Sequence, residues 1–418
     1  MVGTGPGRRD KTRVLIAGGG VAAVEGLLAL RALAGERLEI ELLAPRPEME
    51  YRPLAVTQPF DAGRARTYDL HAIAKDMGAG VRLGALGAVR PGESNAVTRD
   101  GTEIDFDVLF VAVGATPGIA LPGAITLKGP RYTGRYRALL AELKDGRVES
   151  LAFAAPAGAA WVLPLYELAL LTADVVAKHR LDTRLSLVTH EAAPLELFGQ
   201  PASSAVRRLL EERGIELHTA RYVGGVTEDG ILMRPGTERI PAARVVSMPR
   251  LGGPWLPGLS CDREGFIRTD RHGLVEGTDN IYAAGDAIAF PVKQGGLATQ
   301  QADAAAESIA ARAGASVTPR PFRPLLRGML LTGGAPRYMR AEISGGRGES
   351  SDVAEVALWW PPSKIAGRFL SPYLGIRHEE LEIGSDAGVP VEVELEEKPR
   401  AAIKRRVVVT PRADVLRL

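Results

Sequence analysis

Short apolar runs alternate with longer helical patterns at the start of the chain. Residues 13–17 and 38–43 have the length and the largely apolar pattern of strands, and residues 21–33 between them carry mostly apolar side chains over the length of a helix. A strand, a helix and a second strand in this order predict a parallel βαβ unit, because two neighbouring parallel strands need a crossover between them. The chain is therefore predicted to begin with a doubly wound α/β sheet.

A related pattern returns in the middle of the chain. Residues 151–155 and 184–189 are apolar runs, with a helical pattern over residues 163–178 between them. A charged amphipathic helix is predicted over residues 202–213, and Gly214 follows it at a position where helices commonly end on glycine. This pattern predicts a second strand–helix–strand unit of the same kind.

Three further elements complete the expected sheets. Residues 81–113 predict a small β-rich segment that ends in an apolar strand over residues 108–113. Much later, residues 280–284 predict a short strand and residues 297–313 a helix. The last hundred residues follow a proline-rich linker and form a separate C-terminal region.

Charge and cysteine content narrow the class of protein. Lys and Arg number 52 against 50 for Asp and Glu, so the formal net charge of +2 gives no reason to expect a nucleic-acid partner. The one cysteine of the sequence, Cys261, excludes a disulfide within the chain and favours a reducing cytoplasm. It lies in a polar loop, and we expect it to be an inert surface residue.

The N-terminal segment has a second interpretation. Basic residues followed by the apolar stretch from Val14 to Leu33 share features with a secretory signal. However, Glu25 lies inside the stretch and three glycines at 18–20 interrupt it, so we expect these residues to belong to the fold. No segment has the ~20 clean apolar residues of a transmembrane helix.

A glycine motif lies between the first predicted strand and its helix. Gly18, Gly20 and Ala23 follow the G-x-G-x-x-G/A pattern of dinucleotide-binding proteins. Gly18 permits the tight turn, Gly20 lets backbone amides approach a pyrophosphate, and Ala23 is small enough for close packing of helix on strand. The helix N-terminus favours the phosphate charge.

Two further motifs end at glycine after a buried strand. The first ends at Gly114, where the chain can pass close to a dinucleotide. The second is Gly285-Asp286, followed by Lys293-Gln294 at the start of a helix. Asp286 can accept hydrogen bonds from sugar hydroxyls, and the helix can direct its N-terminal amides at a negative ring edge. The alternative role for Asp286 is capping of a helix.

Together, the three motifs resemble those of the FAD-dependent pyridine nucleotide-disulfide oxidoreductase superfamily. The chain looks most like the type II NADH dehydrogenases and sulfide:quinone oxidoreductases, over about residues 13–340. Tyr51-Arg52-Pro53-Leu54 and Glu264-Gly265-Phe266-Ile267 match further stretches of these flavoproteins. The resemblance implies noncovalent FAD, with Lys293 and Gln294 near the flavin ring. The implied cofactor-binding residues are Gly18, Gly20, Ala23, Arg52, Pro53, Gly114, Gly285, Asp286, Lys293 and Gln294.

The expected fold is α/β, with two Rossmann-like dinucleotide-binding domains and a C-terminal α+β region. The FAD-binding domain is discontinuous. The predicted limits are a flexible tail over 1–12, the FAD-binding domain over 13–125 and 256–318, a second Rossmann-like domain over 126–255, and a C-terminal domain over 319–418.

The sequence departs from the family pattern at three places. Ala44 ends the second strand, where an acidic residue usually holds the adenosine ribose, so another group must serve there. The second Rossmann unit retains only Gly158 of a glycine fingerprint, with Pro156 and Trp161 crowding the turn. Such a turn indicates a degraded NAD(P)H site. The sulfide:quinone enzymes need cysteines, and Ala160-Trp161 stands where one is expected.

Glu167 and Lys293 are the candidate catalytic residues. Glu167 lies where type II NADH dehydrogenases carry a glutamate, and a buried glutamate with a raised pKa could relay protons to a quinone. The alternative is a buried glutamate that pairs with a basic neighbour. No metal-ligand spacing links the histidines, and His190 and His272 are interpreted as ordinary loop residues.

Two tryptophans and an apolar face mark the C-terminal region. Trp359 and Trp360 precede a predicted helix whose apolar positions are Ile365, Phe369, Tyr373 and Leu374. This face could contact a membrane interface, where a quinone would enter. We favour packing on the flavin domain or on a second subunit of a homodimer, since interfacial helices have a stronger separation of apolar and polar faces.

The expected function follows from these features. The chain is predicted to be a cytoplasmic FAD-dependent oxidoreductase, or one peripheral on the inner face of the membrane. It would pass electrons from a small-molecule donor, by default NAD(P)H, to a quinone or similar acceptor. One alternative is a sulfide:quinone-like flavoprotein that lacks the cysteines and uses another donor. The other is a non-catalytic, redox-responsive FAD-binding protein.

Overall fold

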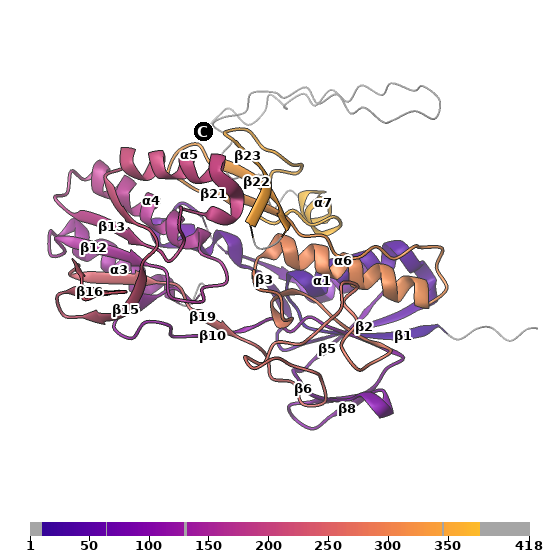
Figure 1. The fold of residues 1–418 in the computed structure, drawn as a ribbon. Helices are drawn as coiled ribbons and strands as arrows, with labels where there is room; N and C mark the ends of the chain where they lie inside the picture. The colour runs from indigo at the N-terminus through magenta and orange to yellow at the C-terminus, as the bar shows by residue number, and fades with distance from the viewer. Residues whose placement is uncertain (1–10, 64, 129–131, 345–346, 377–418) are drawn as a thin grey trace, which may run out of the picture.

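A computed structural model describes the chain except residues 1–10, 64, 129–131, 345–346 and 377–418. Its first sheet has the strand order β20-β9-β1-β2-β5, and all four strand pairs are parallel. The strands are β1 (Thr12–Ala17), β2 (Leu38–Ala44), β5 (Gly80–Leu83), β9 (Val108–Val111) and β20 (Ile281–Ala283). β20 comes from the second half of the sequence, as the discontinuous arrangement predicts (Figure 1).

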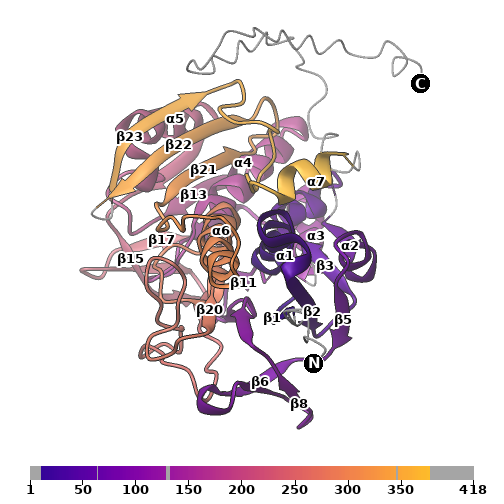
Figure 2. The same ribbon diagram turned by 90° about the vertical axis from the view of Figure 1, so that its right-hand side faces the viewer.

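Two long helices lie side by side over this sheet. They are α1 (Val21–Ala34) and α6 (Gly295–Arg312), which run next to each other in both views (Figure 2). α1 can pack closely because Gly26 faces the Phe110 ring, where any Cβ would lie within 2.3 Å of it. The apolar residues from Val14 to Leu33 are thereby part of a core, and ten residues of α1 are buried, Glu25 among them.

Three smaller elements are inserted between the strands of the first sheet: an antiparallel sheet, a hairpin and a 3-10 helix. A three-stranded antiparallel sheet forms the expected β-rich segment, from β6 (Leu86–Arg90), β7 (Asn95–Thr98) and β8 (Glu103–Asp105). A hairpin of β3 (Glu48–Tyr51) and β4 (Arg66–Asp69) follows β2 and leads into α2 (Leu70–Asp76). Between the two hairpin strands, residues Arg52–Phe60 form a 3-10 helix.

The second sheet has the order β11-β18-β12-β13-β14, again with every pair parallel. Its strands are β11 (Ile125–Thr126), β12 (Ser150–Ala154), β13 (Arg184–Val188), β14 (Ile215–His218) and β18 (Arg244–Ser247). Its helices are α3 (Thr133–Lys144), α4 (Leu163–Lys178) and α5 (Gly199–Glu212). α4 has the predicted limits, whereas α5 begins three residues earlier than predicted.

Two sets of short strands accompany the second sheet. β15 (Tyr222–Thr227), β16 (Gly230–Arg234) and β17 (Arg239–Pro241) form an antiparallel meander. β10 (Thr116–Gly118) pairs antiparallel with β19 (Arg250–Gly252). β10 lies where the chain passes from the first sheet to the second, and β19 lies where it passes back. The two connections between the sheets are therefore paired with each other (Figure 1).

The C-terminal region is an antiparallel sheet followed by one short helix. The sheet contains β21 (Leu325–Leu330), β22 (Arg337–Ser344) and β23 (Arg347–Ala354), and the helix is α7 (Leu370–Ile376). The prediction of one helical face from Ile365 to Leu374 is wrong, because the helix begins only at Leu370. Pro372 lies in its first turn, where proline is tolerated because the amide there has no helical partner.

The C-terminal apolar residues pack against α1 and α6 over the first sheet, one of the two packing arrangements that the sequence favoured. Ile365, Leu370 and Leu374 are buried in the same core as α1 and α6. Trp359 packs edge-on against Tyr338 and donates a hydrogen bond to the carbonyl of Ser363, whereas the Trp360 side chain is 78% exposed. No helix within the described residues has the length and apolar content needed to cross a membrane.

Candidate functional site

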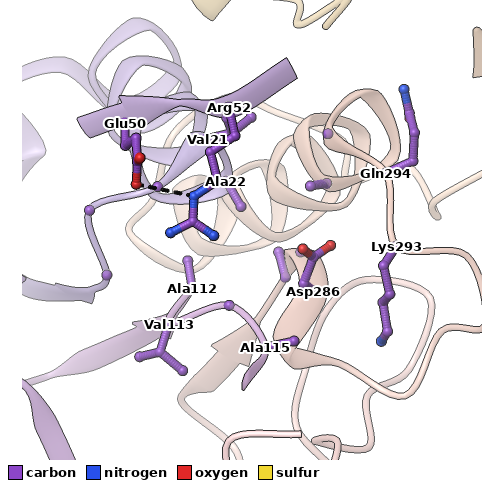
Figure 3. A pocket seen from close by; sticks show the side chains of 18 of the residues that line it. Val21, Ala22, Glu50, Arg52, Ala112, Val113, Ala115, Asp286, Lys293 and Gln294 are labelled. Atoms are coloured by element: carbon purple, nitrogen blue, oxygen red, sulfur yellow. Dashed lines mark hydrogen bonds and ion pairs between the residues drawn. The ribbon is translucent and has the colours of Figure 1, made fainter. Parts of the chain in front are cut away.

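A cavity of about 580 Å³ lies at the carboxyl ends of the central strands of the first sheet. Its floor comes from the residues that directly follow β1, β9 and β20, namely Gly18–Gly20, Ala112–Gly114 and Ala284–Asp286. In open α/β sheets ligands bind at this edge, because the loops there diverge to opposite faces. Figure 3 shows Val21, Ala112, Val113 and Asp286 converging on this space.

The glycine turn after β1 has the geometry that a dinucleotide requires. Gly18 has φ +138°, and a Cβ there would lie 2.2 Å from the carbonyl oxygen of Ala112. Gly20 and Gly114, in contrast, would project a Cβ into open space with no protein atom within 4 Å. α1 begins at this turn with no side-chain cap, which leaves its N-terminal amides available to a phosphate.

Ala23 lies below this surface rather than on it. Its side chain is fully buried in the core, whereas the neighbouring Ala22 lines the cavity. That placement fits the packing role expected for the third small residue of the motif. The residues at the turn therefore fit the pyrophosphate of a dinucleotide such as FAD.

Asp286 projects into the middle of the cavity (Figure 3). Burial raises the pKa of its carboxyl group, and the nearby charges of Lys293 and Arg52 partly offset this rise. The residue belongs to a short 3-10 helix over Gly285–Ala287. Its alternative role as a cap of the following helix is not seen, because Gln294 caps α6 instead.

Lys293 and Gln294 both line the cavity, and their side chains point in opposite directions (Figure 3). The Gln294 carboxamide oxygen accepts a hydrogen bond from the Leu297 amide, 2.9 Å away. The Lys293 ammonium group donates to the carbonyl of Ile288 and lies 3.8 Å from the centre of the Phe266 ring. Burial lowers the pKa of Lys293 to about 8.

An unexpected carboxylate lies close to the glycine turn. Ala44 is buried at the end of β2, as its position in the sequence suggests, but Glu48 and Glu50 on β3 line the cavity instead. Glu50 accepts hydrogen bonds from Arg52 at 3.2 Å and from Arg46 at 3.4 Å (Figure 3). Sequence reasoning missed Glu50 because it lies six residues beyond the position where family members carry their acid.

Glu167 forms a buried ion pair at the far end of the cavity. Its two carboxylate oxygens accept hydrogen bonds from the Lys364 ammonium group at 2.6 and 2.7 Å, and one also accepts from the Leu331 amide at 2.9 Å. Both side chains are at most 7% exposed. Burial raises the pKa of Glu167, although the charge of Lys364 and the hydrogen bonds oppose that shift.

Lys364 connects this pair to the cavity. It lines the cavity and also lies 3.3 Å from the carbonyl oxygen of Pro53, in the loop matched to the family. The basic neighbour that sequence analysis considered for Glu167 is thus Lys364, 197 positions later in the sequence. Nothing in the local pattern around Lys364 could have predicted this contact.

The second Rossmann unit holds its acidic residue inward. Glu191 follows β13 at the place where a nicotinamide-binding unit carries a ribose-binding acid. Here its carboxylate is buried and accepts hydrogen bonds from the Tyr166 hydroxyl at 2.7 Å and the Thr189 hydroxyl at 2.9 Å. Burial raises the pKa of Glu191. An acid two residues after a predicted strand is a signal that the sequence offered and that was overlooked.

The turn of this unit reaches the first cavity. Trp161, Leu163 and Pro164 line the cavity from the N-terminal end of α4. Gly158 adopts φ +73°, as a turn glycine can. The second unit therefore contributes an apolar wall at the end of the cavity where Lys364 lies.

None of the described histidine or cysteine residues lines the cavity. His190 stacks on Tyr222, and His272 lies in a loop. Cys261 is partly buried against the core below the first sheet rather than on the surface as predicted, and burial raises the pKa of its thiol. Among the described residues, no group of three or more His, Cys, Asp or Glu side chains is placed to hold a metal ion.

Comparison with solved structures shows the fold. The sulfide:quinone oxidoreductase of Aquifex aeolicus matches with a TM-score of 0.75 and 18% identity, over 88% of this chain and 90% of that one. A ferredoxin reductase from Rhodopseudomonas palustris matches with a TM-score of 0.61 and 19% identity, over 80% and 83%. NDH2 from Plasmodium falciparum, in complex with NADH, matches with a TM-score of 0.55 and 16% identity, over 67% and 65%.

A family model gives the assignment. The model described as pyridine nucleotide-disulphide oxidoreductase matches residues 12–308, which include both parallel sheets, the glycine turn and Asp286. This confirms the resemblance and the fold class inferred from the sequence. The chain belongs to the pyridine nucleotide-disulphide oxidoreductase family and is an FAD-dependent oxidoreductase.

Proposed function

We propose that this protein passes electrons from a small reduced donor, through FAD, to a quinone or similar small acceptor. The observation that carries the proposal is the extent of the cavity. It runs from the glycine turn, past Asp286, to Lys364 and its buried partner Glu167. One cavity thereby joins a dinucleotide-binding turn to a pair of groups that can exchange a proton.

In this proposal the cavity residues hold noncovalent FAD. The amides of Gly19 and Gly20 bind the pyrophosphate, since the Gly18 amide donates to the carbonyl of Leu43. Gly114 lets the chain pass close by, and Asp286 accepts hydrogen bonds from sugar hydroxyls. Glu50 takes the place of the acid missing at Ala44. The flavin ring of FAD lies among five residues of the cavity, namely Arg52, Pro53, Gly285, Lys293 and Gln294. FAD supplies the electron-transfer chemistry, and the protein supplies position and charge.

Glu167 and Lys364 move protons in this proposal. Reduction of a quinone consumes protons, and Lys364 of the buried pair lines the cavity proposed to hold the acceptor. Lys364 can donate a proton to an acceptor oxygen, which leaves its amine neutral beside the Glu167 carboxylate. That carboxylate can then take up a proton from solvent and pass it to the amine. A carboxyl group whose pKa burial has raised is suited to return that proton.

The family makes NAD(P)H the default donor. Two features of the second Rossmann unit favour a second candidate, a sulfide:quinone-like flavoprotein without cysteines that uses another donor. Pro156 and Trp161 crowd the turn where a nicotinamide dinucleotide would lie. Glu191 is occupied by Tyr166 and Thr189 rather than open to a ribose.

Anaerobic titration of the purified protein with NADH and then NADPH decides between the donors. Rapid bleaching of the flavin absorbance by either nucleotide supports the default. A flavin spectrum that neither nucleotide bleaches, but whose reduced form quinone reoxidises over many turnovers, supports the second candidate. Bound flavin that no donor and acceptor pair turns over identifies a non-catalytic flavoprotein. Absence of flavin after reconstitution refutes the proposal.

The location and assembly of the protein are separate proposals. We propose a cytoplasmic protein that touches the inner face of the membrane through the loop carrying Val356 and Trp360, which are 59% and 78% exposed. Flotation with liposomes should weaken for Trp360→Ser and be unchanged for Tyr222→Ser, an exposed aromatic elsewhere. If neither the wild-type protein nor the variant floats with liposomes, the proposed membrane contact is refuted. Sedimentation velocity tests the homodimer.

A further inference from the structure

Arg327 lies on the edge strand of the C-terminal sheet, at the wall of the cavity. Side chains alternate between the two faces of a strand, and the neighbouring Gly328 faces Phe198 and Leu163 in the core. Arg327 therefore leaves β21 on the opposite face. It is half-buried there, and Gln294 donates a hydrogen bond to its backbone carbonyl at 3.2 Å, which fixes the strand against the start of α6.

The guanidinium group of Arg327 has no counter-charge in the part of the chain that the structure describes. Lys364 pairs with Glu167, Arg52 pairs with Glu50, and Lys293 donates to a backbone carbonyl. Arg327, in contrast, forms no ion pair with any residue that the structure describes, and its Nε is buried without a hydrogen-bond acceptor. A buried donor without a partner costs free energy, so its presence at a cavity wall calls for an acceptor that enters from outside.

A second arginine increases the local positive charge. Arg340 lies directly opposite Arg327 in the register of β21 and β22, so both side chains are on the same face. Like charges in this position repel each other. Burial and the charge of Arg340 lower the pKa of Arg327. Asp352 faces Arg340 from the far strand and is exposed, one strand farther from the cavity.

We propose that the electron acceptor of this enzyme carries an acidic group, which Arg327 binds while Trp161 and Met329 contact its ring. A guanidinium group presents two parallel N–H donors that match a carboxylate or sulfonate. The apolar side chains lie along the same cavity and can cover a flat ring. This inference rests on the proposed function, because it adds a charge requirement to the acceptor.

Binding to the oxidised, FAD-loaded protein tests the inference without turnover. Isothermal titration compares 1,4-naphthoquinone-2-sulfonate with neutral 1,4-naphthoquinone. We expect wild-type protein to prefer the sulfonate. Arg327→Gln should weaken sulfonate binding about tenfold or more, the loss expected for a charge-assisted pair, and should leave the neutral quinone unchanged. Arg327→Lys should restore part of the affinity. Arg323→Gln, the same charge change at an exposed site, should alter neither.

The possible outcomes separate this inference from the proposed function. If both quinones bind equally and are reduced, the proposed function stands and the anion site is refuted. If only naphthalene-2-sulfonate binds, and does so through Arg327, the anion site stands and the quinone acceptor is refuted. If Arg327→Gln shifts the flavin midpoint potential but not the affinity for the sulfonate, Arg327 serves the flavin, which overturns the inference.

Discussion

At the scale of single residues, the glycine turn offers the sharpest test of the cavity. Gly20→Ala places a methyl group where no protein atom lies within 4 Å, and its φ of −97° is open to any residue. The variant should fold normally but lose FAD affinity about tenfold or more, because the methyl group occupies the approach to the pyrophosphate. Flavin fluorescence on dilution measures the loss.

The control is Gly134→Ala, which also projects into open space but lies on α3, away from the cavity. It should leave FAD affinity unchanged. Equal FAD affinity in Gly20→Ala and wild type would contradict the placement of the cofactor. Gly18→Ala is less informative, since its Cβ would collide with Ala112 and destabilise the protein whether or not FAD binds there.

The Glu167–Lys364 pair makes a second residue-scale prediction. Glu167→Gln leaves the Lys364 ammonium group buried without a carboxylate, and we expect unfolding free energy to fall by about 3 kcal/mol. Adding Lys364→Met to that variant should recover most of the loss, because it removes the unpaired charge. Urea unfolding of wild type, Glu167→Gln, Lys364→Met and the double variant gives the coupling free energy between the two side chains. Strictly additive losses would show that the two groups do not depend on each other.

The matched control is an exposed pair. Arg147 and Asp145 are 2.7 Å apart, but both side chains are more than half exposed. Removing either should leave the unfolding midpoint nearly unchanged, since solvent screens such pairs. The comparison separates the effect of burial from the effect of ion pairing itself.

At the scale of elements, a carboxyl group on one helix holds the start of another. Glu25, buried on α1, accepts hydrogen bonds from the amides of Phe369 and Leu370 at 2.8 and 2.7 Å. These amides begin α7, so Glu25 does for this short helix what a local cap does for most helices. Gly367 has no side chain because a Cβ there would lie 2.6 Å from the Glu25 carboxylate.

Asp303 on α6 lies beside Glu25 and gives this junction a pH dependence. Burial and the negative charges of Glu25 and Glu307 raise the pKa of Asp303 to about 9. The positive charge of Arg368 opposes this rise. The folded state therefore binds a proton that the unfolded state releases near pH 4. The contribution of Asp303 to the unfolding free energy is therefore fully present below about pH 4 and is lost progressively as the pH rises toward 9.

Asp303→Asn removes the titration. We expect the variant to gain stability relative to wild type as pH rises from 5.5 to 8.5, by on the order of 1 kcal/mol or more. Urea unfolding at the two pH values measures the difference. Asp182→Asn, at an exposed position, should show no such trend. If the unfolding free energies of Asp303→Asn and wild type differ by the same amount at both pH values, the raised pKa of Asp303 is refuted.

At the scale of the whole molecule, one cavity is bounded by three parts of the described chain. Its walls come from the first sheet, from the start of α4 in the second unit and from β21 in the C-terminal sheet. FAD should therefore stabilise the entire protein, by about 2.7 kcal/mol when its concentration is a hundred times the dissociation constant. Thermal unfolding across a series of FAD concentrations tests this.

Riboflavin provides the matched comparison. It has the flavin ring but no pyrophosphate for the amides of Gly19 and Gly20. The midpoint should rise much less with riboflavin than with the same concentration of FAD. A midpoint that does not respond to FAD, or that responds equally to both compounds, would contradict the assignment of the glycine turn.

Local patterns were sufficient to predict the sheets. The apolar run at 13–17, the glycine turn and the helix at 163–178 all have their causes within a few residues, and the structure has them within one or two positions. The C-terminal helix was misplaced because Ile365 and Phe369 are spaced as in a helix, but Ile365 is buried and Phe369 partly buried against the core of α1 and α6 rather than by helical neighbours. Periodicity alone cannot distinguish those two causes.

The deep end of the cavity could not be predicted in the same way. Glu167 was singled out through family resemblance, but its partner Lys364 comes from a loop 197 positions away. Arg327 carries no sequence signal, since an arginine on an edge strand is ordinarily solvated. Its isolation becomes visible only when the neighbours of its side chain are known. The residues that contact the cofactor therefore follow from the sequence, whereas those expected to choose the substrate do not.

The position of β20 also bears on how the protein is made. β9 has β1 on one side, and its other edge is closed only by Ile281–Ala283, about 170 residues later in the chain. At ordinary rates of synthesis those residues emerge on the order of ten seconds after β9. During that time a ribosome-bound chain would present an unpaired, wholly apolar strand edge, Val108–Val111, which is a surface for mispairing. We expect nascent chains that stop before residue 281 to depend on chaperones, and full-length chains to escape that dependence once β20 is in place.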